Sequence, residues 1–162
     1  NTTNTLTAES AMLSELLDDL VQDLSSVSQA KGMRIDLHKD LDEQARLIYP
    51  SMSKMVFGNI LRNALNYSQG SEIDVILQRN KVLIADNGIG ISLPDNSKVQ
   101  ELSGQQLQLE VKGHGIGLQL VQKLCKQLGW RVELFDRQYY LSTHKDVNLA
   151  MTTGLIVVVY IH

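Results

Sequence analysis

The sequence predicts an α/β protein, a two-layer α/β sandwich in which helices cover one face of a mixed β-sheet. Segments with helical periodicity alternate along the chain with segments of strand-like patterning. A hairpin pattern lies near the middle, and two further strand patterns follow the last long helix. The chain has 162 residues, 43 % hydrophobic and 20 % charged, which suits one domain with its own core.

The N-terminal part predicts a helix followed by two strands. Leucine and valine recur at three- and four-residue spacing from residue 8 to about Ala30, and Gly32 follows as a terminator. Residues 33–39, MRIDLHK, alternate apolar and polar side chains as a half-buried strand does. Residues 46–49, RLIY, are expected to be a short partner strand.

The middle of the chain predicts a helix and a hairpin. Pro50 suits the first turn of a helix that Gly70 ends. Residues 72–78, EIDVILQ, and residues 81–86, KVLIAD, flank two turn residues and read as paired strands. The second strand therefore delivers Asp86 at its end.

The C-terminal half predicts a lid, a helix and two strands. From Gly88 to Lys112 the pattern weakens into a Gln- and Ser-rich segment, longer than an ordinary connection and typical of a lid. Residues 115–129 form an amphipathic helix pattern that ends in glycine. Residues 130–137, WRVELFDR, and residues 154–162, GLIVVVYIH, predict strands, the second of them buried.

Composition excludes several classes of partner. Fifteen basic and eighteen acidic residues give a net charge of −3, and no basic run is interleaved with aromatics, so we expect no nucleic acid. No apolar run approaches the roughly eighteen residues of a membrane span, so we expect no membrane contact by this fragment. Cys125, the single cysteine, falls on an apolar helix face and is expected to be a core thiol in a reducing compartment.

The first residues predict a fragment of a longer protein. The start, NTTNTLTAES, has neither an initiator Met nor a signal-peptide pattern. We expect residues 1–11 to be a linker or the tail of a preceding domain, and residues 12–162 to be the functional domain.

Asn59, Asn63 and Tyr67 are predicted to share one helix face with apolar residues such as Val56. Two buried amides would each cost on the order of 1–3 kcal/mol if left unpaired, so something polar must meet them. The side-chain carbonyl of Asn63 is a suitable oxygen ligand for Mg²⁺ shared with substrate phosphates. Asn59 would face the phosphates or the metal's waters, and Tyr67 would stack on a purine. For this segment alone, asparagines that cap neighbouring backbone groups and a core Tyr67 fit equally well.

Asp86 comes where a predicted strand gives way to Gly88 and Gly90, which let the backbone turn sharply and a flat base approach closely. A carboxylate there can accept a hydrogen bond from the six-amino group of adenine. Guanine carries a carbonyl at that position, so Asp86 is expected to select ATP over GTP. Alone, the motif also fits an ordinary Asp-Asn-Gly turn, but the asparagine helix upstream and a second glycine motif downstream favour a nucleotide.

Gly113, Gly115 and Gly117 allow backbone amides to point into a common space at a helix N-terminus, where the helix dipole favours phosphate. The order of strand, glycine turn, helix, strand and Asp136 also imitates a dinucleotide-binding unit. Its register is wrong by one residue, because the third glycine of that motif would fall at Leu118. A dinucleotide site would also leave the asparagine helix and Asp86 unexplained.

Other polar side chains have simpler interpretations. Lys112 is a candidate for a charge on the terminal phosphate, and His114 either touches phosphate or is a spacer whose backbone alone matters. His38, His144 and His162 lack the spacing of a metal site, so we expect surface or structural roles for them.

These three segments, in this order, resemble the motifs of the catalytic and ATP-binding domain of bacterial sensor histidine kinases, in the superfamily shared with gyrase, Hsp90 and MutL. NILRNALNYS resembles the N box, DNGIGI the first glycine box and GHGIGL the second, and the similarity spans roughly residues 12–162. The resemblance implies the Bergerat ATP-binding fold, with a lid over the nucleotide, and an ATP-binding catalytic domain at residues 12–162.

The resemblance also implies a role for each matching residue. By position, Asn63 would ligate magnesium, Asn59 would assist at the phosphates and Asp86 would bind the adenine amine, with Tyr67 in the base pocket. Asn59 and Asn63 are thus the expected catalytic residues, and ATP and Mg²⁺ the expected cofactors. The expected nucleotide-binding residues are Asn59, Asn63, Asn66, Tyr67, Asp86, Gly88, Gly90, Lys112, Gly113, His114, Gly115, Ile116, Gly117 and Leu118.

Position 59 favours phosphoryl transfer over hydrolysis. ATPases such as gyrase carry a Glu there that takes a proton from water, whereas Asn59 has no useful basicity near neutral pH. In sensor kinases the acceptor is a histidine on a separate helical hairpin, and no histidine of this chain lies in the acceptor pattern. The resemblance therefore implies an ATP-dependent protein histidine kinase of a two-component system. Its partners would be a helical dimerisation domain and a response regulator, and it would lie in the cytoplasmic part of an inner-membrane sensor.

Some positions depart from the family pattern. Asn66 replaces the usual Lys of the N box, Tyr49 stands where an Asp is common, and the lid lacks a phenylalanine-bearing motif. The late Gly-Thr signature is at best Thr152-Thr153-Gly154. Two alternatives stay open: a serine kinase of the anti-sigma type, and a pseudokinase module that binds nucleotide or a partner without transfer.

Overall fold

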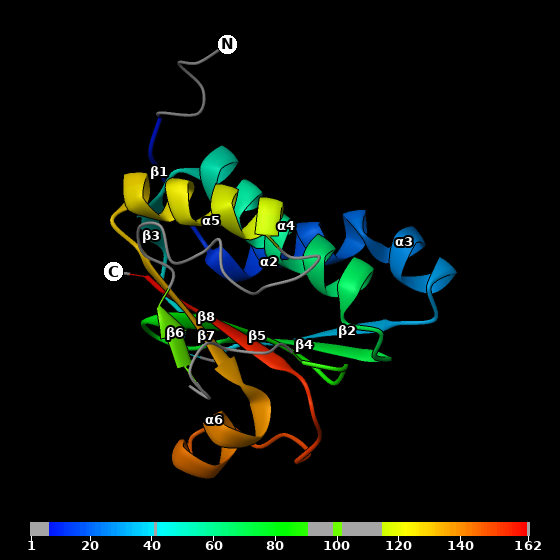
Figure 1. Cartoon of the computed structure of the whole chain (residues 1–162). Helices are drawn as coiled ribbons and strands as arrows, with labels where there is room; N and C mark the ends of the chain where they lie inside the picture. The colour runs from blue at the N-terminus through cyan, green and yellow to red at the C-terminus, as the bar shows by residue number, and fades with distance from the viewer. Residues whose placement is uncertain (1–6, 41, 91–98, 102–114, 162) are drawn as a thin grey trace.

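The computed structural model describes residues 7–40, 42–90, 99–101 and 115–161 (Figure 1). Within these residues a six-stranded mixed sheet lies beneath a layer of helices. Its strands β2 and β4 are parallel, and every other neighbouring pair is antiparallel. In spatial order the strands are β2 (Arg34–His38), β4 (Glu72–Leu77), β5 (Lys81–Asp86), β8 (Leu155–Tyr160), β7 (Arg131–Asp136) and β6 (Val99–Glu101). The predicted two-layer α/β sandwich is confirmed.

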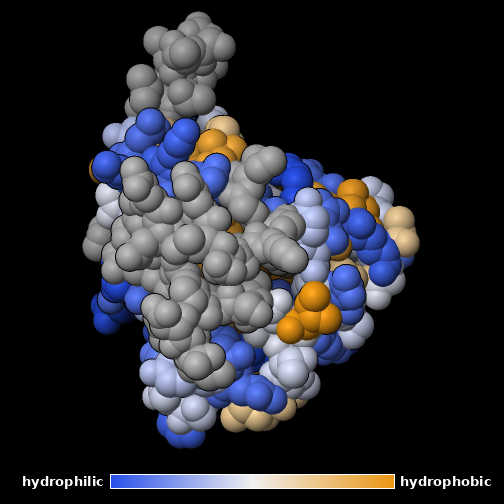
Figure 2. Space-filling view, in the orientation of Figure 1, coloured by the Kyte–Doolittle hydropathy of each residue, from blue (hydrophilic) through white to orange (hydrophobic). Residues whose placement is uncertain are grey.

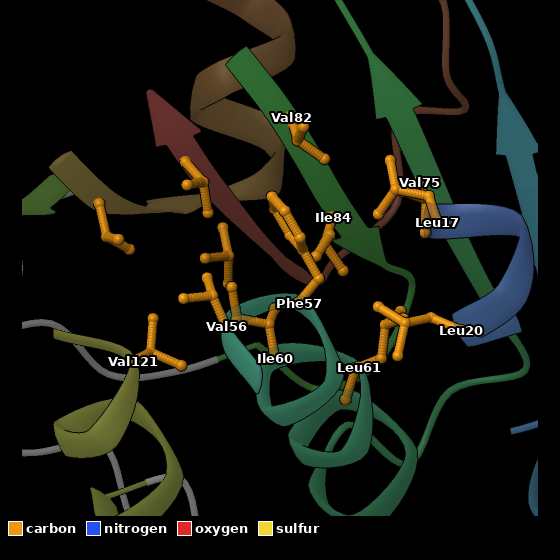
Figure 3. Close-up of a cluster of buried hydrophobic side chains, with 14 of the residues drawn as sticks. Leu17, Leu20, Val56, Phe57, Ile60, Leu61, Val75, Val82, Ile84 and Val121 are labelled. Carbon is orange, nitrogen blue, oxygen red and sulfur yellow. The ribbon is translucent and has the colours of Figure 1, made fainter. Parts of the chain in front are cut away.

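The main core lies between the sheet and three helices, α2 (Leu13–Asp23), α4 (Pro50–Tyr67) and α5 (Gly115–Leu128). Figure 3 shows how side chains of α4 meet those of β5, with Phe57 and Ile60 close to Ile84. Cys125 on α5 is buried in this core, and burial raises the pKa of its thiol to about 12. The predicted core thiol is confirmed.

Long, strongly patterned segments adopt the predicted structure. Helix α4 has Pro50 in its first turn, where no backbone N–H is needed, and ends shortly before Gly70. Strands β4 and β5 form the predicted hairpin, in which Ile73 is paired with Asp86. Helix α5 and strands β7 and β8 also lie where their patterns indicated.

The N-terminal segment differs from the prediction of one long helix. A short strand, β1 (Glu9–Ala11), precedes α2, and a second helix, α3 (Ser25–Ala30), follows it. Leu24 separates the two helices with a backbone outside helical geometry, while its side chain is buried in the core. The three- and four-residue spacing of leucines therefore continues across a bend that periodicity alone cannot detect.

The predicted pairing of residues 46–49 was wrong. Strand β3 (Arg46–Ile48) pairs with β1 in a separate two-stranded antiparallel sheet. The edge strand β2 instead pairs with β4 in parallel. A parallel pair needs a long crossover connection, and the segment that contains α4 supplies it.

The prediction that the helices cover one face of the sheet was also incomplete. A short helix, α6 (Arg137–Thr143), lies against the opposite face, below the sheet in Figure 1. Its residues Tyr140 and Leu141 pack against Phe135, Leu83 and Ile156. The Asp136 carboxylate caps this helix by accepting a hydrogen bond from the N–H of Tyr139 at 3.0 Å. Seven residues are too few for helical periodicity to show in the sequence.

The surface seen in Figure 2 is mostly hydrophilic, with apolar side chains isolated among polar ones. Exposed large hydrophobic residues of the described chain include Leu47, Ile89 and Met151, which belong to different segments. Among the helices in the described ranges, none combines the length and the apolar character that crossing a bilayer requires.

Candidate functional site

A small pocket lies between α4, the end of β5, the first turn of α5 and the start of β8. It contains one residue from each of the three motifs that the sequence singled out, namely Asn63, Asp86 and Leu118. The other residues that line it are Ile60, Ala64, Ile84, Leu155 and Val157. The pocket is therefore an apolar slot with two polar side chains, the usual composition of a small-molecule site.

Asn63 points its amide into buried space. The residue is only 9 % exposed, and its Nδ2 has no hydrogen-bond partner among the described residues. Buried polar groups are nearly always paired, and an orphan costs about 1–3 kcal/mol. The O and N atoms of an amide are assigned from the hydrogen-bond network. The buried end of the Asn63 amide, placed as nitrogen here, is therefore the end without a partner.

Asn59 behaves differently from Asn63. Its Nδ2 donates to the carbonyl oxygen of Met55, one turn earlier, at 2.7 Å, and the residue is half-buried. This bond is the backbone capping that we considered as an alternative for the asparagines. It uses the nitrogen of Asn59 and leaves the oxygen uncommitted by that bond.

Asp86 is held by backbone amides on one oxygen. The residue is 4 % exposed, and its Oδ1 accepts hydrogen bonds from the N–H of Gly88 at 2.9 Å and of Leu155 at 3.3 Å. Neither bond uses Oδ2, so that oxygen is the acceptor the geometry leaves for a ligand in the pocket. Burial raises the pKa of the Asp86 carboxyl above its ordinary value, against the opposing effects of the two amide bonds and of the Arg137 charge.

The turn after Asp86 favours glycine at two positions, for two different reasons. A Cβ on Gly88 would lie 1.9 Å from the carbonyl oxygen of Ser68, and Gly90 has a positive φ of 77°. The turn is also tied to the segment before β8, since the Thr153 hydroxyl donates to the Gly88 carbonyl at 2.8 Å. The reduced signature Thr152-Thr153-Gly154 thus contacts the turn directly.

Two predicted residues of the asparagine helix lie outside the pocket lining. Tyr67, near the end of α4, is 42 % exposed, and Asn66 is exposed beside it. Among the described residues, neither belongs to the set that lines the pocket.

The second glycine motif is described only in part. Gly115, Ile116 and Gly117 begin α5, and Leu118 is buried in the pocket wall. The start of a helix favours negative charge through its dipole. Lys112, Gly113 and His114, with most of the predicted lid, lie outside the described residues.

The remaining described histidines have partners away from the pocket. His38 contacts the Asp74 carboxylate at 2.8 Å, and His144 stacks on Tyr140 with 3.8 Å between ring centroids. These contacts agree with the predicted structural or surface roles. In the described part of the chain, no three side chains of the usual metal-binding types come together. His162 lies outside the described residues.

Sequence reasoning missed several residues that shape the turn. Asn87 accepts hydrogen bonds from the N–H groups of Ser71 and Glu72 at 2.8 and 2.9 Å, which joins the turn to the start of β4. The N–H of Leu155 holds Asp86. Arg137 donates to the Asp86 carbonyl at 2.9 Å. An Asn after an Asp was a visible signal for Asn87, but no local pattern marks Leu155 or Arg137.

Comparisons with known proteins agree on one family. Residues 50–161 match the model of the family "Histidine kinase-, DNA gyrase B-, and HSP90-like ATPase". The sensor protein QseC of Escherichia coli O157:H7 is 30 % identical over 122 residues, which are 75 % of this chain and 27 % of that protein. The chain thus spans about a quarter of that curated relative.

Solved structures agree on the fold. The catalytic domain of histidine kinase ThkA, in a nucleotide-free form, superposes with a TM-score of 0.65 at 15 % identity, over 96 % of this chain and 97 % of that one. Full-length ShkA in complex with AMPPNP superposes with a TM-score of 0.69 at 16 % identity, over 95 % of this chain and 30 % of that one.

Proposed function

The chain belongs to the family of histidine kinase-, DNA gyrase B- and HSP90-like ATPases, and we propose that it is the ATP-binding catalytic domain of a two-component sensor histidine kinase. Its reaction is transfer of the γ-phosphoryl group of Mg-ATP to a histidine on a separate helical dimerisation domain. The observation that carries the proposal is the pocket itself, in which a buried amide without a partner and a buried carboxylate face one apolar slot.

Adenine is the base that the lining of this slot favours. Oδ1 of Asp86 is already occupied by two backbone amides, which fixes the carboxylate and leaves Oδ2 to accept from the adenine six-amino group. The apolar walls, including Ile84 and Leu118, suit the flat faces of a purine. Guanine would present its carbonyl oxygen to the carboxylate, and the unpaired contact would weaken GTP binding.

The polar side chains of α4 fit magnesium and phosphate. The free amide of Asn63 can supply the hard oxygen ligand that Mg²⁺ requires, one helical turn from the Asn59 oxygen. When bound, the ion neutralises charge on the phosphates during transfer. The start of α5 favours the same negative charge through its dipole. The remaining nucleotide-binding assignments, including Lys112, Gly113 and His114, follow from the family motif alone.

Transfer is favoured over hydrolysis by the chemistry of position 59. The Asn59 amide donates to the Met55 carbonyl and has no basicity with which to activate water. The chain then contributes binding and positioning, and the second substrate must come from another domain. We propose that residues 12–162 form this catalytic domain, that residues 1–11 lead from the preceding domain, and that the parent is a membrane sensor with this part in the cytoplasm. A response regulator would receive the phosphoryl group from the acceptor histidine.

Calorimetric titration with ATP and with GTP, each with magnesium, tests the proposal first. We expect ATP to bind and GTP to bind much more weakly, because only adenine pairs with Asp86. Equal binding of both nucleotides would contradict the role of Asp86. Absence of binding to either would contradict the proposed ATP site.

Labelling of an acceptor separates the three possible activities. Incubation with radiolabelled ATP and the helical phosphoacceptor domain of the parent protein should give an acid-labile, base-stable phosphohistidine. An acid-stable phosphate on an anti-sigma antagonist would instead identify a serine kinase. ATP binding without labelling of either acceptor would identify a pseudokinase, the outcome that Asn66 in place of the usual Lys would explain.

A further inference from the structure

Arg137 is the most deeply buried charged residue in the described chain that the proposed chemistry leaves without a role. It is 2 % exposed and opens helix α6, on the face of the sheet opposite to the pocket. A buried guanidinium carries a large desolvation cost unless its donors are paired. The groups that accept hydrogen bonds from Arg137 therefore indicate its role.

The guanidinium holds two main-chain carbonyls. Nη1 donates to the carbonyl oxygen of Asp86 at 2.9 Å, through a buried bond. Nε and Nη2 donate to the carbonyl oxygen of Ala150 at 3.2 and 2.9 Å. The forked shape of the side chain lets one residue reach both carbonyls at once. Arg137 thereby joins the end of β5 to the segment that leads into β8.

The same residue also fixes the segment before β8 through its backbone. The N–H of Arg137 donates to the Gly154 carbonyl at 3.0 Å. Gly154 lies so close to Asp86 that a Cβ there would be 2.1 Å from the Asp86 carbonyl oxygen. The next residue, Leu155, gives its N–H to Oδ1 of the Asp86 carboxylate. Arg137 therefore holds both backbone segments that orient this carboxylate, the end of β5 at Asp86 and the start of β8 at Gly154 and Leu155.

Electrostatic interactions also connect Arg137 with the Asp86 carboxyl. The acidic groups that interact with Arg137 are Asp74, Asp86 and Glu72, and Asp74 is itself in contact with His38. The positive charge of Arg137 opposes the effect of burial on the Asp86 carboxyl and favours its ionised form, although burial has the larger effect. The ionised form is the stronger acceptor at Oδ2, because a proton on that oxygen would face the donor hydrogens of a base amine.

We propose that Arg137 is a positioning residue for base recognition, which acts from behind the sheet to hold the Asp86 carboxylate in place for adenine. The proposal rests on the proposed function, since it assumes that Asp86 binds the base. Arg137 itself touches no ligand in this scheme. Its effect reaches the pocket through the Asp86 carbonyl and the Gly154–Leu155 backbone.

The test measures ATP affinity of the whole chain from pH 5.5 to 8.5 in wild type, Arg137→Met and Arg137→Lys. We expect Arg137→Met to lower ATP affinity about tenfold near neutral pH, because the hydrogen bonds from the guanidinium to the Asp86 and Ala150 carbonyls are lost. We also expect its low-pH loss of affinity to begin at a higher pH than in wild type, because the nearby positive charge is lost. Arg137→Lys keeps the charge and should recover most of the pH effect but only part of the affinity. Ratios to wild type at each pH cancel the titration of the nucleotide.

Leu141→Ala is the matched structural control. Leu141 is buried on the same short helix and packs with Phe135 and Tyr140, but its side chain cannot form a hydrogen bond to the Asp86 turn. This variant should lose stability and keep the wild-type pH profile for ATP. If Arg137→Met has the same profile and affinity as wild type, or if Leu141→Ala shifts the profile equally, the proposal is overturned.

Two further comparisons keep the outcomes separable. A wild-type chain that binds no ATP would overturn the proposed function, whereas ATP binding that depends on Asp86 but not on Arg137 would overturn only this inference. If Arg137→Met does not fold, NMR of the wild-type chain decides. The Asp86 carboxyl carbon and the Arg137 Nε should then titrate with one shared midpoint, and an Arg137 signal that ignores this titration would refute the coupling.

Discussion

The two faces of the sheet bury polar groups in different ways. On the face under α6, the Tyr140 hydroxyl is met by Lys81 at 3.1 Å and Asp74 is met by His38. On the face under the long helices, Asn63 keeps an amide nitrogen without a partner at the pocket. Within the described residues two other buried side-chain atoms lack partners, on Arg46 and Ser53, and neither lines that pocket.

The comparison teaches how a binding site differs from a polar core. A polar core satisfies its groups internally and gains stability from them, whereas a binding site leaves one group for a ligand and accepts the cost. Substitutions on the two faces should therefore have opposite profiles. Those at the pocket should impair nucleotide chemistry with little effect on folding. Those of the polar groups under α6 should do the reverse, with the exception of Arg137, which holds the Asp86 carbonyl.

The largest effect is expected for Asn63→Ala. Loss of the oxygen ligand should reduce phosphoryl transfer to the helical acceptor domain on the order of a thousandfold, because charge on the phosphates is no longer neutralised in place. The free energy of unfolding should change by no more than about 1 kcal/mol, since the amide is unpaired without ligand. Acceptor labelling and urea denaturation measure the two quantities.

A large fall in stability with normal labelling would place Asn63 with the polar core and remove the contrast between the faces. Arg62→Ala is a suitable control, because Arg62 is exposed on the same helix and lies outside the described pocket lining.

Asp86→Asn should weaken ATP binding on the order of a hundredfold. The new amide nitrogen would oppose the adenine amine, so that two donors face each other. The fold should remain stable, because a neutral side chain can still accept from Gly88 and Leu155 and loses the desolvation cost of the buried carboxylate. Calorimetry and thermal unfolding test this pair of results. Unchanged ATP affinity would exclude Asp86 from base recognition.

Tyr140→Phe should lower the stability of the fold and leave ATP affinity unchanged, and its effect should be smaller than those of the two pocket variants. Removal of the hydroxyl deletes the bond from Lys81 and should cost about 1 kcal/mol of stability. ATP affinity should stay at the wild-type value, because Tyr140 lies on the face away from the pocket. Denaturant unfolding and ATP titration of one preparation give both numbers. A loss of ATP affinity larger than the loss of stability would show that the two faces are coupled at this residue.

Acidification should produce the smallest effect, and in opposite directions for binding and folding. The pKa of Asp86 is raised in the fold, so the folded state binds this proton more readily than the unfolded state does. Between the unfolded pKa of 3.8 and the higher folded pKa, the contribution of this group to stability therefore grows as the pH falls. ATP affinity should fall over the same window, because a proton on the carboxyl weakens the hydrogen bond that it accepts from the adenine amine. Subtraction of the same curves for Asp86→Asn isolates this group, and parallel trends in the two quantities would contradict the assignment.

Much of the site could be predicted because its residues lie in strongly patterned segments. The helix of Asn63 has both a start signal at Pro50 and an apolar face, and the hairpin alternation places Asp86 at the end of β5. These features depend on neighbours in sequence. Local pattern and tertiary contact therefore agree there.

The parts that could not be predicted depend on partners far away in the chain. Strand β3 has too few residues to choose between β1 and β2, and α6 is shorter than two full periods of a helix. Arg137 reads as a surface residue at a strand end until the fold brings the carbonyls of Asp86 and Ala150 around it. Long-range hydrogen bonds of this kind leave no periodic trace in the sequence.

The position of β8 has a consequence for how this protein is made in the cell. This strand is the last described element along the chain, yet it lies inside the sheet between β5 and β7. The ribosome completes Asp86 well before it completes Gly154 and Leu155, whose backbone encloses and orients that carboxylate. A nascent chain that ends just before β8 therefore has all three predicted nucleotide motifs but no formed pocket, and the pocket is complete only after β8 has left the exit tunnel and inserted between its neighbours.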